Sequence, residues 1–224
     1  ELDMTSITLL PEDKQALIAT VNPESATDNY VTWSTSDATV ATVENGVVTA
    51  VAVGTATITV TTIEGGFTAT CAVTVNPRPV TGVTLDKAEA TLEVKETVAL
   101  VATVAPANAT NKDVTWTSDN EAVATVANGV VTAVAEGTAT ITVTTMDGSF
   151  TATCVVTVKP ISVKGIALDK TALTLKAKQT ATLVATITPA DAANQNVTWA
   201  TDNAEVATVE NGVVTAVAVG TATI

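Results

Sequence analysis

Apolar and polar residues alternate over short segments of this chain. In TATITVT (residues 138–144) and FTATCVVTV (residues 150–158), every second residue is apolar and most residues between are threonine. The apolar row of the second segment runs from Phe150 through Cys154 to Val158. A period of two with one apolar face is typical of strands half-buried in a two-layer structure, so both segments are predicted to be β-strands.

The same reading gives further strands in this stretch. Residues 97–104 (TVALVATV) are predicted to form one strand whose inward row begins at Val98 and ends at Val104. In VTWT (residues 114–117), Val114 and Trp116 share a face. In VATV (123–126) and VVTAV (130–134) both faces are partly apolar. Which face of these two points inward stays open.

Turn signals separate the predicted strands. Asn128-Gly129 lies between two strand-like segments, and Asn-Gly favours a two-residue hairpin because both residues tolerate positive φ. Asp147-Gly148 is predicted to do the same before the last strand, and residues 118–120 mark the turn after the Trp116 strand. About seven or eight short strands in some 80 residues indicate a β-sandwich, with no helix of useful length.

The pattern recurs along the chain. Tryptophans at positions 33, 116 and 199 are separated by 83 residues, and residues 40–58 are identical to residues 206–224. This is a tandem array of one 83-residue module. The chain is predicted to contain three modules: residues 1–79, which lack the first few residues of the module; residues 80–162, which are complete; and residues 163–224, which lack the last strands.

The residues that follow Trp116, from SDNEAVATVANGVVTAVAEG to TATITVTTMDGSFTATCVVTV, closely resemble the bacterial immunoglobulin-like domain group 2, of the intimin and invasin superfamily. The likeness extends to all three copies. It implies an all-β fold of tandem immunoglobulin-like β-sandwiches in an exported protein. Such modules serve as spacers or adhesive units on cell-surface proteins and on some phage structural proteins. No particular ligand is implied.

Composition excludes several functions. The 10 basic and 23 acidic residues give a net charge of −13, which disfavours nucleic acid and anionic lipid as partners. Threonine interrupts every hydrophobic stretch, so no direct membrane insertion is expected. The chain has no histidine, and no nucleophile-elbow, P-loop or dinucleotide motif is present. We therefore predict that this segment is no enzyme and has no catalytic or cofactor-binding residues.

The tryptophans and cysteines are the remaining distinctive side chains. Trp33, Trp116 and Trp199 could stack on sugars, but each alternates in phase with a valine, which favours a place in the core. Cys71 and Cys154 occupy the same strand position in different modules, so they are expected to lie about one module length apart, roughly 30 Å. A disulfide needs Cα atoms within about 7 Å, so no disulfide between them is expected. We predict that both are buried, unreactive thiols.

Calcium binding and glycan attachment are two further possibilities for the acidic residues and asparagines. Calcium at the linkers requires several converging carboxylates, but NPRPV (76–80) and KPISV (159–163) contain no acid. Loop carboxylates are the remaining candidates: Asp86, Asp113 and Asp119. We expect no metal site and no cofactor. Asn108 and Asn196 match the N-glycosylation pattern, which is short enough to occur by chance.

Short linkers that contain Pro77, Pro79 and Pro160 restrict hinge motion. Three modules joined end to end are expected to form a rod of roughly 100 Å, at about 30 Å each. The favoured function is a structural stalk or spacer that projects another domain, with neighbouring modules of the same chain as partners. The expected location is extracellular, on a cell surface or a phage virion, and any export signal is expected to have been removed or to lie upstream of Glu1.

Two alternatives stay open. Residues 23–30 (PESATDNY) form the most variable loop and could bind a host glycan or surface protein, as in an adhesin. An incomplete terminal module could instead accept a strand from a neighbouring subunit, as in an extracellular filament or phage fibre. We expect the incomplete modules to reflect a longer array, because no spare donor strand precedes Glu1.

Overall fold

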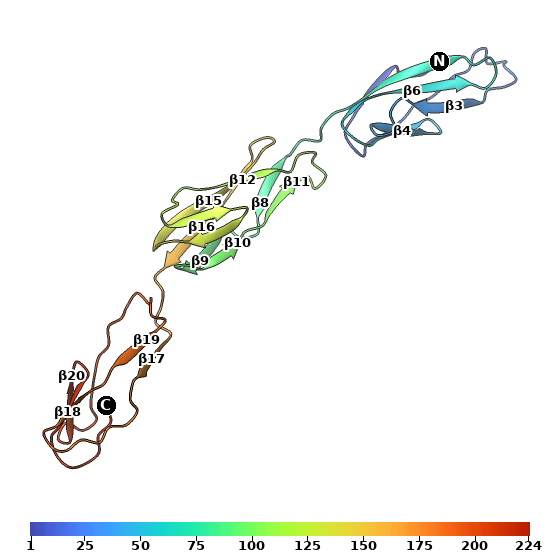
Figure 1. Ribbon diagram of the computed structural model, residues 1–224. Helices are drawn as coiled ribbons and strands as arrows, with labels where there is room; N and C mark the ends of the chain where they lie inside the picture. The colour runs from blue at the N-terminus through green and yellow to red at the C-terminus, as the bar shows by residue number, and fades with distance from the viewer. The chain divides into compact units, whose positions relative to one another are not determined.

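The computed structural model describes residues 1–224, which form β-strands and no helix (Figure 1). No helix could therefore cross a membrane. The chain forms two compact units. The first contains Glu1–Asp86, Val101–Trp116 and Thr142–Thr153, and the second contains Lys87–Leu100, Thr117–Ile141 and Cys154–Ile224. The module boundaries given above stay a prediction, and the modules are called first, second and third repeat below.

The first repeat has two sheets. Its strands are β1 (Ser6–Leu9), β2 (Lys14–Ala16), β3 (Val31–Thr35), β4 (Ala41–Glu44), β5 (Val47–Ala50), β6 (Gly54–Thr62) and β7 (Thr68–Val75). One sheet has the order β1-β7-β6-β3 and the other the order β2-β5-β4. In the second repeat the four-stranded sheet has the corresponding order β9 (Glu89–Glu93), β16 (Thr151–Lys159), β15 (Gly137–Thr145) and β12 (Val114–Ser118). The predicted all-β, immunoglobulin-like sandwich is confirmed.

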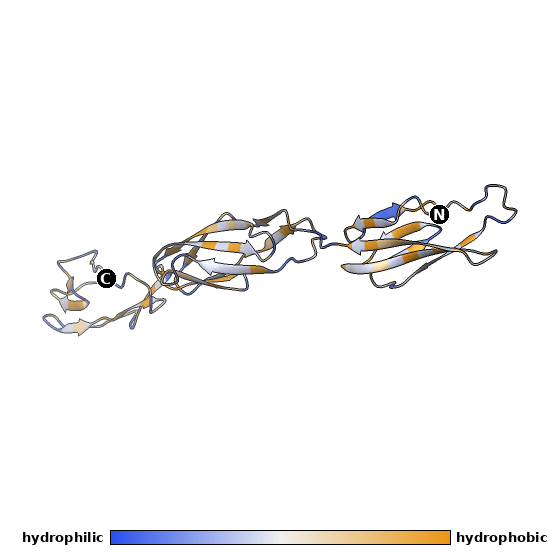
Figure 2. Ribbon diagram, turned by 90° about the horizontal axis from the view of Figure 1, so that it is seen from above, coloured by the Kyte–Doolittle hydropathy of each residue, from blue (hydrophilic) through white to orange (hydrophobic).

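The core of the first repeat lies between these two sheets. Ile58 and Cys71 of the first sheet and Val48 of the second have no exposed surface, and Trp33 packs against the same cluster. The apolar rows along the long strands appear as orange segments that alternate with paler ones (Figure 2). Alternation in the sequence therefore predicts the buried face correctly.

The Asn-Gly turns are hairpins of the predicted kind. Asn45 and Gly46 join β4 to β5 with φ of 49° and 80°, and the Asn128-Gly129 and Asn211-Gly212 turns repeat these values to within one degree. A Cβ on Gly46 would lie 2.8 Å from the Leu17 carbonyl oxygen, so glycine is required there. The Asp147-Gly148 turn differs from prediction. Positive φ occurs at Gly148 and Ser149, within a longer loop closed by a hydrogen bond from Thr145 to Phe150.

The strands of the second repeat are β8 (Gly82–Leu85), β9 (Glu89–Glu93), β10 (Thr97–Ala99), β11 (Ala102–Ala105), β12 (Val114–Ser118), β13 (Ala124–Ala127), β14 (Val130–Ala133), β15 (Gly137–Thr145) and β16 (Thr151–Lys159). The prediction of one strand over 97–104 is wrong. β10 pairs with β14, whereas β11 pairs with β8, so the segment changes sheets at Leu100 and Val101. The inward alternation continues across the break, which explains why the pattern resembled one strand.

Burial also decides the face that the sequence left open. Val131 and Ala133 are buried, whereas Val130 and Val134 are exposed. The inward row of VVTAV therefore begins at its second residue.

The first and second repeats each contain a parallel pair. β1 pairs with β7 from Ser6↔Ala72 to Leu9↔Val75, and β9 pairs with β16 from Glu89↔Val155 to Glu93↔Lys159. A parallel pair cannot be joined by a tight hairpin, so no local turn signal marks it in the sequence.

The third repeat has fewer strands: β17 (Gly165–Leu168), β18 (Thr180–Thr182), β19 (Ala185–Thr188), β20 (Ala207–Glu210) and β21 (Val213–Ala216). Residues 197–201, which correspond to β12 and contain Trp199, are not in a strand. In the first repeat the corresponding strand β3 is paired by β6. Residues 220–224 correspond to the first five residues of β6, and the given sequence ends before the counterparts of Thr59–Thr62, with which Val31–Ser34 pair in the first repeat. Residues 197–200 therefore have no counterpart of these partners.

Candidate functional site

The tryptophans lie against the core side of the Asn-Gly turns. A Cβ on Gly46 would lie 3.1 Å from Cζ2 of Trp33, and one on Gly212 would lie 3.2 Å from Cζ2 of Trp199. Trp116 is half-buried, like its counterparts. The predicted core position is confirmed for Trp33, which packs against the buried cluster of the first repeat.

Cys71 and Cys154 are fully buried thiols, and neither forms a disulfide. Burial, together with the negative charge of Asp3, raises the pKa of the Cys71 thiol above its ordinary value. The reactive thiolate is therefore rare at neutral pH, as predicted for a structural cysteine.

We expect a thiol reagent such as Ellman's reagent to modify native Cys71 and Cys154 at least a hundred times more slowly than the denatured chain. The reason is that reaction requires access to the sulfur, which burial denies at both cysteines, and in addition a thiolate, which the raised pKa of Cys71 makes rarer. Absorbance at neutral pH, with and without denaturant, gives the two rates. Rapid labelling of the native chain would show that the strands carrying these thiols open readily.

Two of the three carboxylates considered for calcium, those of Asp86 and Asp119, accept hydrogen bonds from the backbone. Oδ1 of Asp86 accepts the Val101 N–H at 2.7 Å, and Oδ1 of Asp119 accepts the Thr140 N–H at 2.7 Å. Asp113 uses its main-chain oxygen to accept the Met146 N–H. No group of three or more His, Cys, Asp or Glu side chains that could hold a metal ion is present.

The two glycosylation candidates are both exposed. The Asn108 side chain donates to Glu12 at 2.7 Å, and the Asn196 main-chain N–H donates to Asn194 at 2.9 Å. Asn108 thus already has a side-chain partner.

The first linker is bonded on both sides. The Nη2 group of Arg78 donates to the Pro11 carbonyl at 2.7 Å and to Asp13 at 2.8 Å, both in the first repeat. The main-chain N–H of Arg78 donates to the Thr110 hydroxyl in the second repeat, at 2.7 Å. The Leu10 N–H and the Arg78 guanidinium hold the pKa of Asp13 below its ordinary value. The sequence showed Arg78 in the linker but gave no signal for the distant Asp13.

The second linker is held in a similar way by Glu93. This carboxylate accepts hydrogen bonds from the Ser162 hydroxyl and forms an ion pair with Lys164 at 3.2 Å. Both contacts hold the pKa of Glu93 below its ordinary value. The Ala193 N–H also donates to the Ile161 carbonyl at 2.9 Å. The linker therefore has bonds to residues of the second and third repeats.

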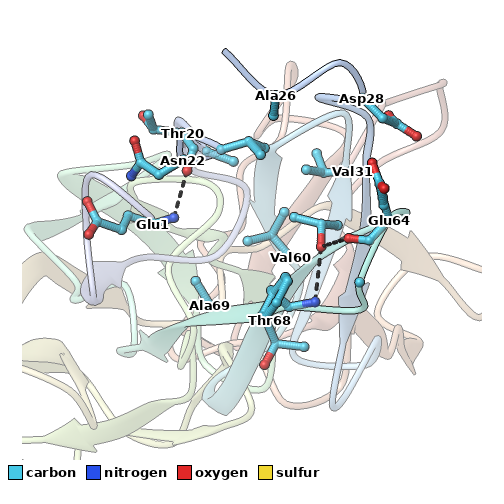
Figure 3. A pocket seen from close by; sticks show the side chains of 15 residues that line it. Glu1, Thr20, Asn22, Ala26, Asp28, Val31, Val60, Glu64, Thr68 and Ala69 are labelled. Atoms are coloured by element: carbon cyan, nitrogen blue, oxygen red, sulfur yellow. Dashed lines mark hydrogen bonds between the residues drawn. The ribbon is translucent and has the colours of Figure 1, made fainter. Parts of the chain in front are cut away.

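A groove of about 470 Å³ lies at the start of the first repeat. Val31 and Val60 lie between its two sides, with Glu1, Thr20 and Asn22 on one side and Asp28 and Glu64 on the other (Figure 3). The groove is lined by Glu1, Ala19, Thr20, Val21, Asn22, Ala26, Asp28, Val31, Val60, Thr62, Glu64, Gly65, Phe67, Thr68 and Ala69. The groove includes part of the variable loop 23–30. No sequence pattern predicted this groove.

The first repeat has two packed sheets, which are antiparallel except for one parallel pair at an edge, and an inward tryptophan. These features define an immunoglobulin-like β-sandwich. The sequence matches the bacterial Ig-like domain (group 2) over residues 1–73, 79–156 and 162–224. The chain therefore belongs to this family, and the resemblance seen in the sequence is confirmed.

Three relatives are similar over part of the chain. An uncharacterized protein of Clostridium acetobutylicum is 41% identical over 133 residues, which are 58% of this chain and 14% of that protein. An Ig-like virion protein of Serratia phage KSP90 is 36% identical over 135 residues, 58% of this chain and 52% of that protein. An alpha-L-arabinofuranosidase of Bifidobacterium longum is 41% identical over 126 residues, 54% of this chain and 12% of that protein. The chain spans about half or less of each relative.

Proposed function

We propose that this chain is a non-catalytic spacer in an exported bacterial surface protein or a phage virion protein, where it projects another domain. The observation that carries the proposal is the bonding of both linkers. Arg78 contacts residues of the first and second repeats, and Glu93 and its partners join the second and third. A spacer must transmit position from one module to the next, and a linker fixed on both sides does so.

Surface chemistry supports the same function. The outward rows of β6 and β15 are largely threonine, and the chain has only one tyrosine and three tryptophans. Binding surfaces are usually enriched in aromatic residues and arginine. The relation to an Ig-like virion protein supports a place on an exposed particle or cell surface.

The length of the particle tests the spacer. We expect small-angle X-ray scattering of the 224-residue chain to give a maximum dimension of roughly 100 Å, because each module contributes about 30 Å along its strands. A compact particle of about half that length would contradict the proposal.

Replacement of Arg78 with alanine should loosen the first junction. The variant loses hydrogen bonds to Pro11 and Asp13, so we expect a broader distribution of distances between spin labels in the first two repeats. Electron spin resonance on labels placed at exposed threonines would measure it. We expect little change in melting temperature, since the ion pair is partly exposed.

Lys14→Ala is the matched control, because it removes the same charge from an exposed position in β2 without touching the linker. Its distance distribution should equal that of the original chain. Equal broadening in both variants would show that net charge, and not the Arg78 bonds, sets the width.

Adhesion is a second candidate, favoured by exposed apolar side chains at one end of the first repeat. Tyr30, Ile63 and Phe67 are all exposed, and the Ile63 N–H donates to the Tyr30 carbonyl. Arrays of glycans and matrix proteins would test it. Binding that is lost in Tyr30→Ala but retained in Thr42→Ala, a change on the exposed side of β4, would favour adhesion over a passive spacer.

A further inference from the structure

The three Asn-Gly hairpins share one geometry and one chemical property. In each turn, at residues 45–46, 128–129 and 211–212, the asparagine is exposed and the glycine is buried. The φ values of the three turns agree to within one degree, and the flanking strands stay paired up to the turn, as at Glu44↔Val47. An asparagine that is open to water and followed by glycine is chemically prone to deamidation.

Deamidation is an intramolecular reaction between these two residues. The main-chain nitrogen of the glycine attacks the side-chain amide carbon of the asparagine, so that a carbon–nitrogen bond forms. The glycine nitrogen loses its proton, and the side-chain nitrogen leaves as ammonia. Water then opens the resulting cyclic succinimide at one of its two carbonyl carbons, which gives aspartate or isoaspartate. Glycine favours the attack because it has no side chain to obstruct its nitrogen.

The folded turn holds the reacting atoms apart. The φ values of 49° at Asn45 and 80° at Gly46 are those of a type I′ turn, in which ψ of the first central residue is about 30°. At this ψ the glycine nitrogen lies on the opposite side of the Cα–C bond from the asparagine side chain. Ring closure needs both on the same side, which corresponds to a ψ of about −120°, as in a type II′ turn. The native turn is therefore far from the arrangement in which the reaction proceeds.

Contacts of the glycine oppose the rotation that would bring these atoms together. The Leu17 N–H donates to the Gly46 carbonyl at 2.8 Å, and Leu100 and Leu183 make the same bond in the other repeats at the same distance. A Cβ on Gly46 would lie 2.8 Å from the Leu17 carbonyl oxygen and 3.1 Å from Trp33, so the main chain of the turn is closely packed. Movement of the peptide unit between Asn45 and Gly46 disturbs this packing, and ring closure thus requires the hairpin to open.

We propose that Asn45, Asn128 and Asn211 are modification sites whose deamidation depends on opening of their hairpins, and that isoaspartate, once formed, prevents the hairpin from closing again in its native geometry. Deamidation is slow compared with local opening and closing, so its rate follows the fraction of open molecules. The proposal holds whether or not the chain serves as a spacer.

The two products have opposite consequences for the turn. Aspartate keeps the main chain unchanged, and Asp-Gly is favoured in the same turn type. Isoaspartate adds a methylene group to the main chain, so the loop is longer than a two-residue hairpin accepts and the glycine no longer fits between Leu17 and Trp33. A repeat that has been held open thus acquires a permanent chemical record of that opening.

Incubation of the 224-residue chain at mildly alkaline pH, followed by tandem mass spectrometry, tests the dependence on opening. We expect all three asparagines to deamidate at least about tenfold more slowly in the native chain than in guanidinium chloride, because the native hairpins are mostly closed. Residues 40–58 and 206–224 are identical, so Asn45 and Asn211 should share one rate in the denatured chain. Equal rates in the native and denatured chains would overturn the proposal.

Trp33→Ala selects the first site, because this indole packs against Gly46. Under native conditions we expect Asn45 to deamidate at least about tenfold faster in this variant, while Asn128 keeps its slow rate. The control Thr32→Ala removes an exposed side chain from the same strand and should leave both rates unchanged. Equal acceleration at Asn45 and Asn128, or a slow Asn45 in a first repeat that hydrogen exchange shows to be open, would contradict the proposal.

The two products can be compared directly. Asn45→Asp should keep the hydrogen-exchange protection of β4 and β5, whereas the isoaspartate fraction of the aged chain, separated by chromatography and identified by enzymatic methylation, should lose it. Native protection of both strands in the isoaspartate fraction would overturn the claim that this product keeps the hairpin from closing.

Discussion

Replacing Trp33 with alanine is expected to unfold the first repeat or to bring it close to unfolding. Loss of a packed indole from a core typically destabilises by about 3–5 kcal/mol, a large part of the stability of a small domain. Trp33 packs against the buried cluster and lies under the Asn45-Gly46 turn, so the change affects both sheets. Hydrogen-exchange mass spectrometry should show loss of protection in β6 and β7, while β15 and β16 stay protected.

Trp33→Phe serves as the control, since a smaller ring still fills part of the site and should cost less than half as much. A second comparison concerns the Asn45-Gly46 turn that contacts the indole. The added methyl group of Gly46→Ala would meet the Leu17 carbonyl, whereas that of Gly66→Ala, at a similar positive φ, has open space around it. Gly46→Ala should therefore destabilise the first repeat more than Gly66→Ala. Unchanged exchange in Trp33→Ala would show that the indole lies outside the core.

Extending the chain after Ile224 with the sequence of residues 142–159 is expected to complete the third repeat. Ile166 is 61% exposed, whereas its counterpart Val83 is 8% exposed in the second repeat. The added strands should cover Ile166 and Leu168 and pair with residues 197–201. Each aliphatic side chain that becomes buried contributes about 1.5–3 kcal/mol, so the gain in stability amounts to several kcal/mol. Circular dichroism should show more strand, and amides of β17 should exchange more slowly.

The matched control carries serine in place of the residues that correspond to Cys154, Val156 and Val158. These side chains form the inward row of β16, so the altered extension has no apolar face with which to dock. It should leave β17 exchange unchanged. Equal protection by both extensions would show that chain length, and not core packing, limits the third repeat.

Local features of the sequence predicted much of this structure. Two-residue Asn-Gly turns, period-two strands and the place of Trp33 all depend on neighbours within a few residues or on simple burial. Because the pattern recurs every 83 residues, each of these predictions applied to all three repeats. Family membership followed from the same residues.

The features that escaped prediction depend on distant partners. The parallel pairing of β1 with β7 joins segments at opposite ends of a repeat, and the division of residues 97–104 depends on β8 and β14. Arg78 required knowledge of where Asp13 lies.

The parallel pairs have a mechanical consequence. In β1 and β7 the first strand begins at one end of the pair and the last strand finishes at the other, so tension between the ends of the repeat acts along both strands. The hydrogen bonds across the pair lie at an angle to that load and are strained together, in shear, instead of breaking one after another as in a peeled hairpin. Under a stretching load the β1–β7 pair would therefore resist separation more strongly than a hairpin of the same length.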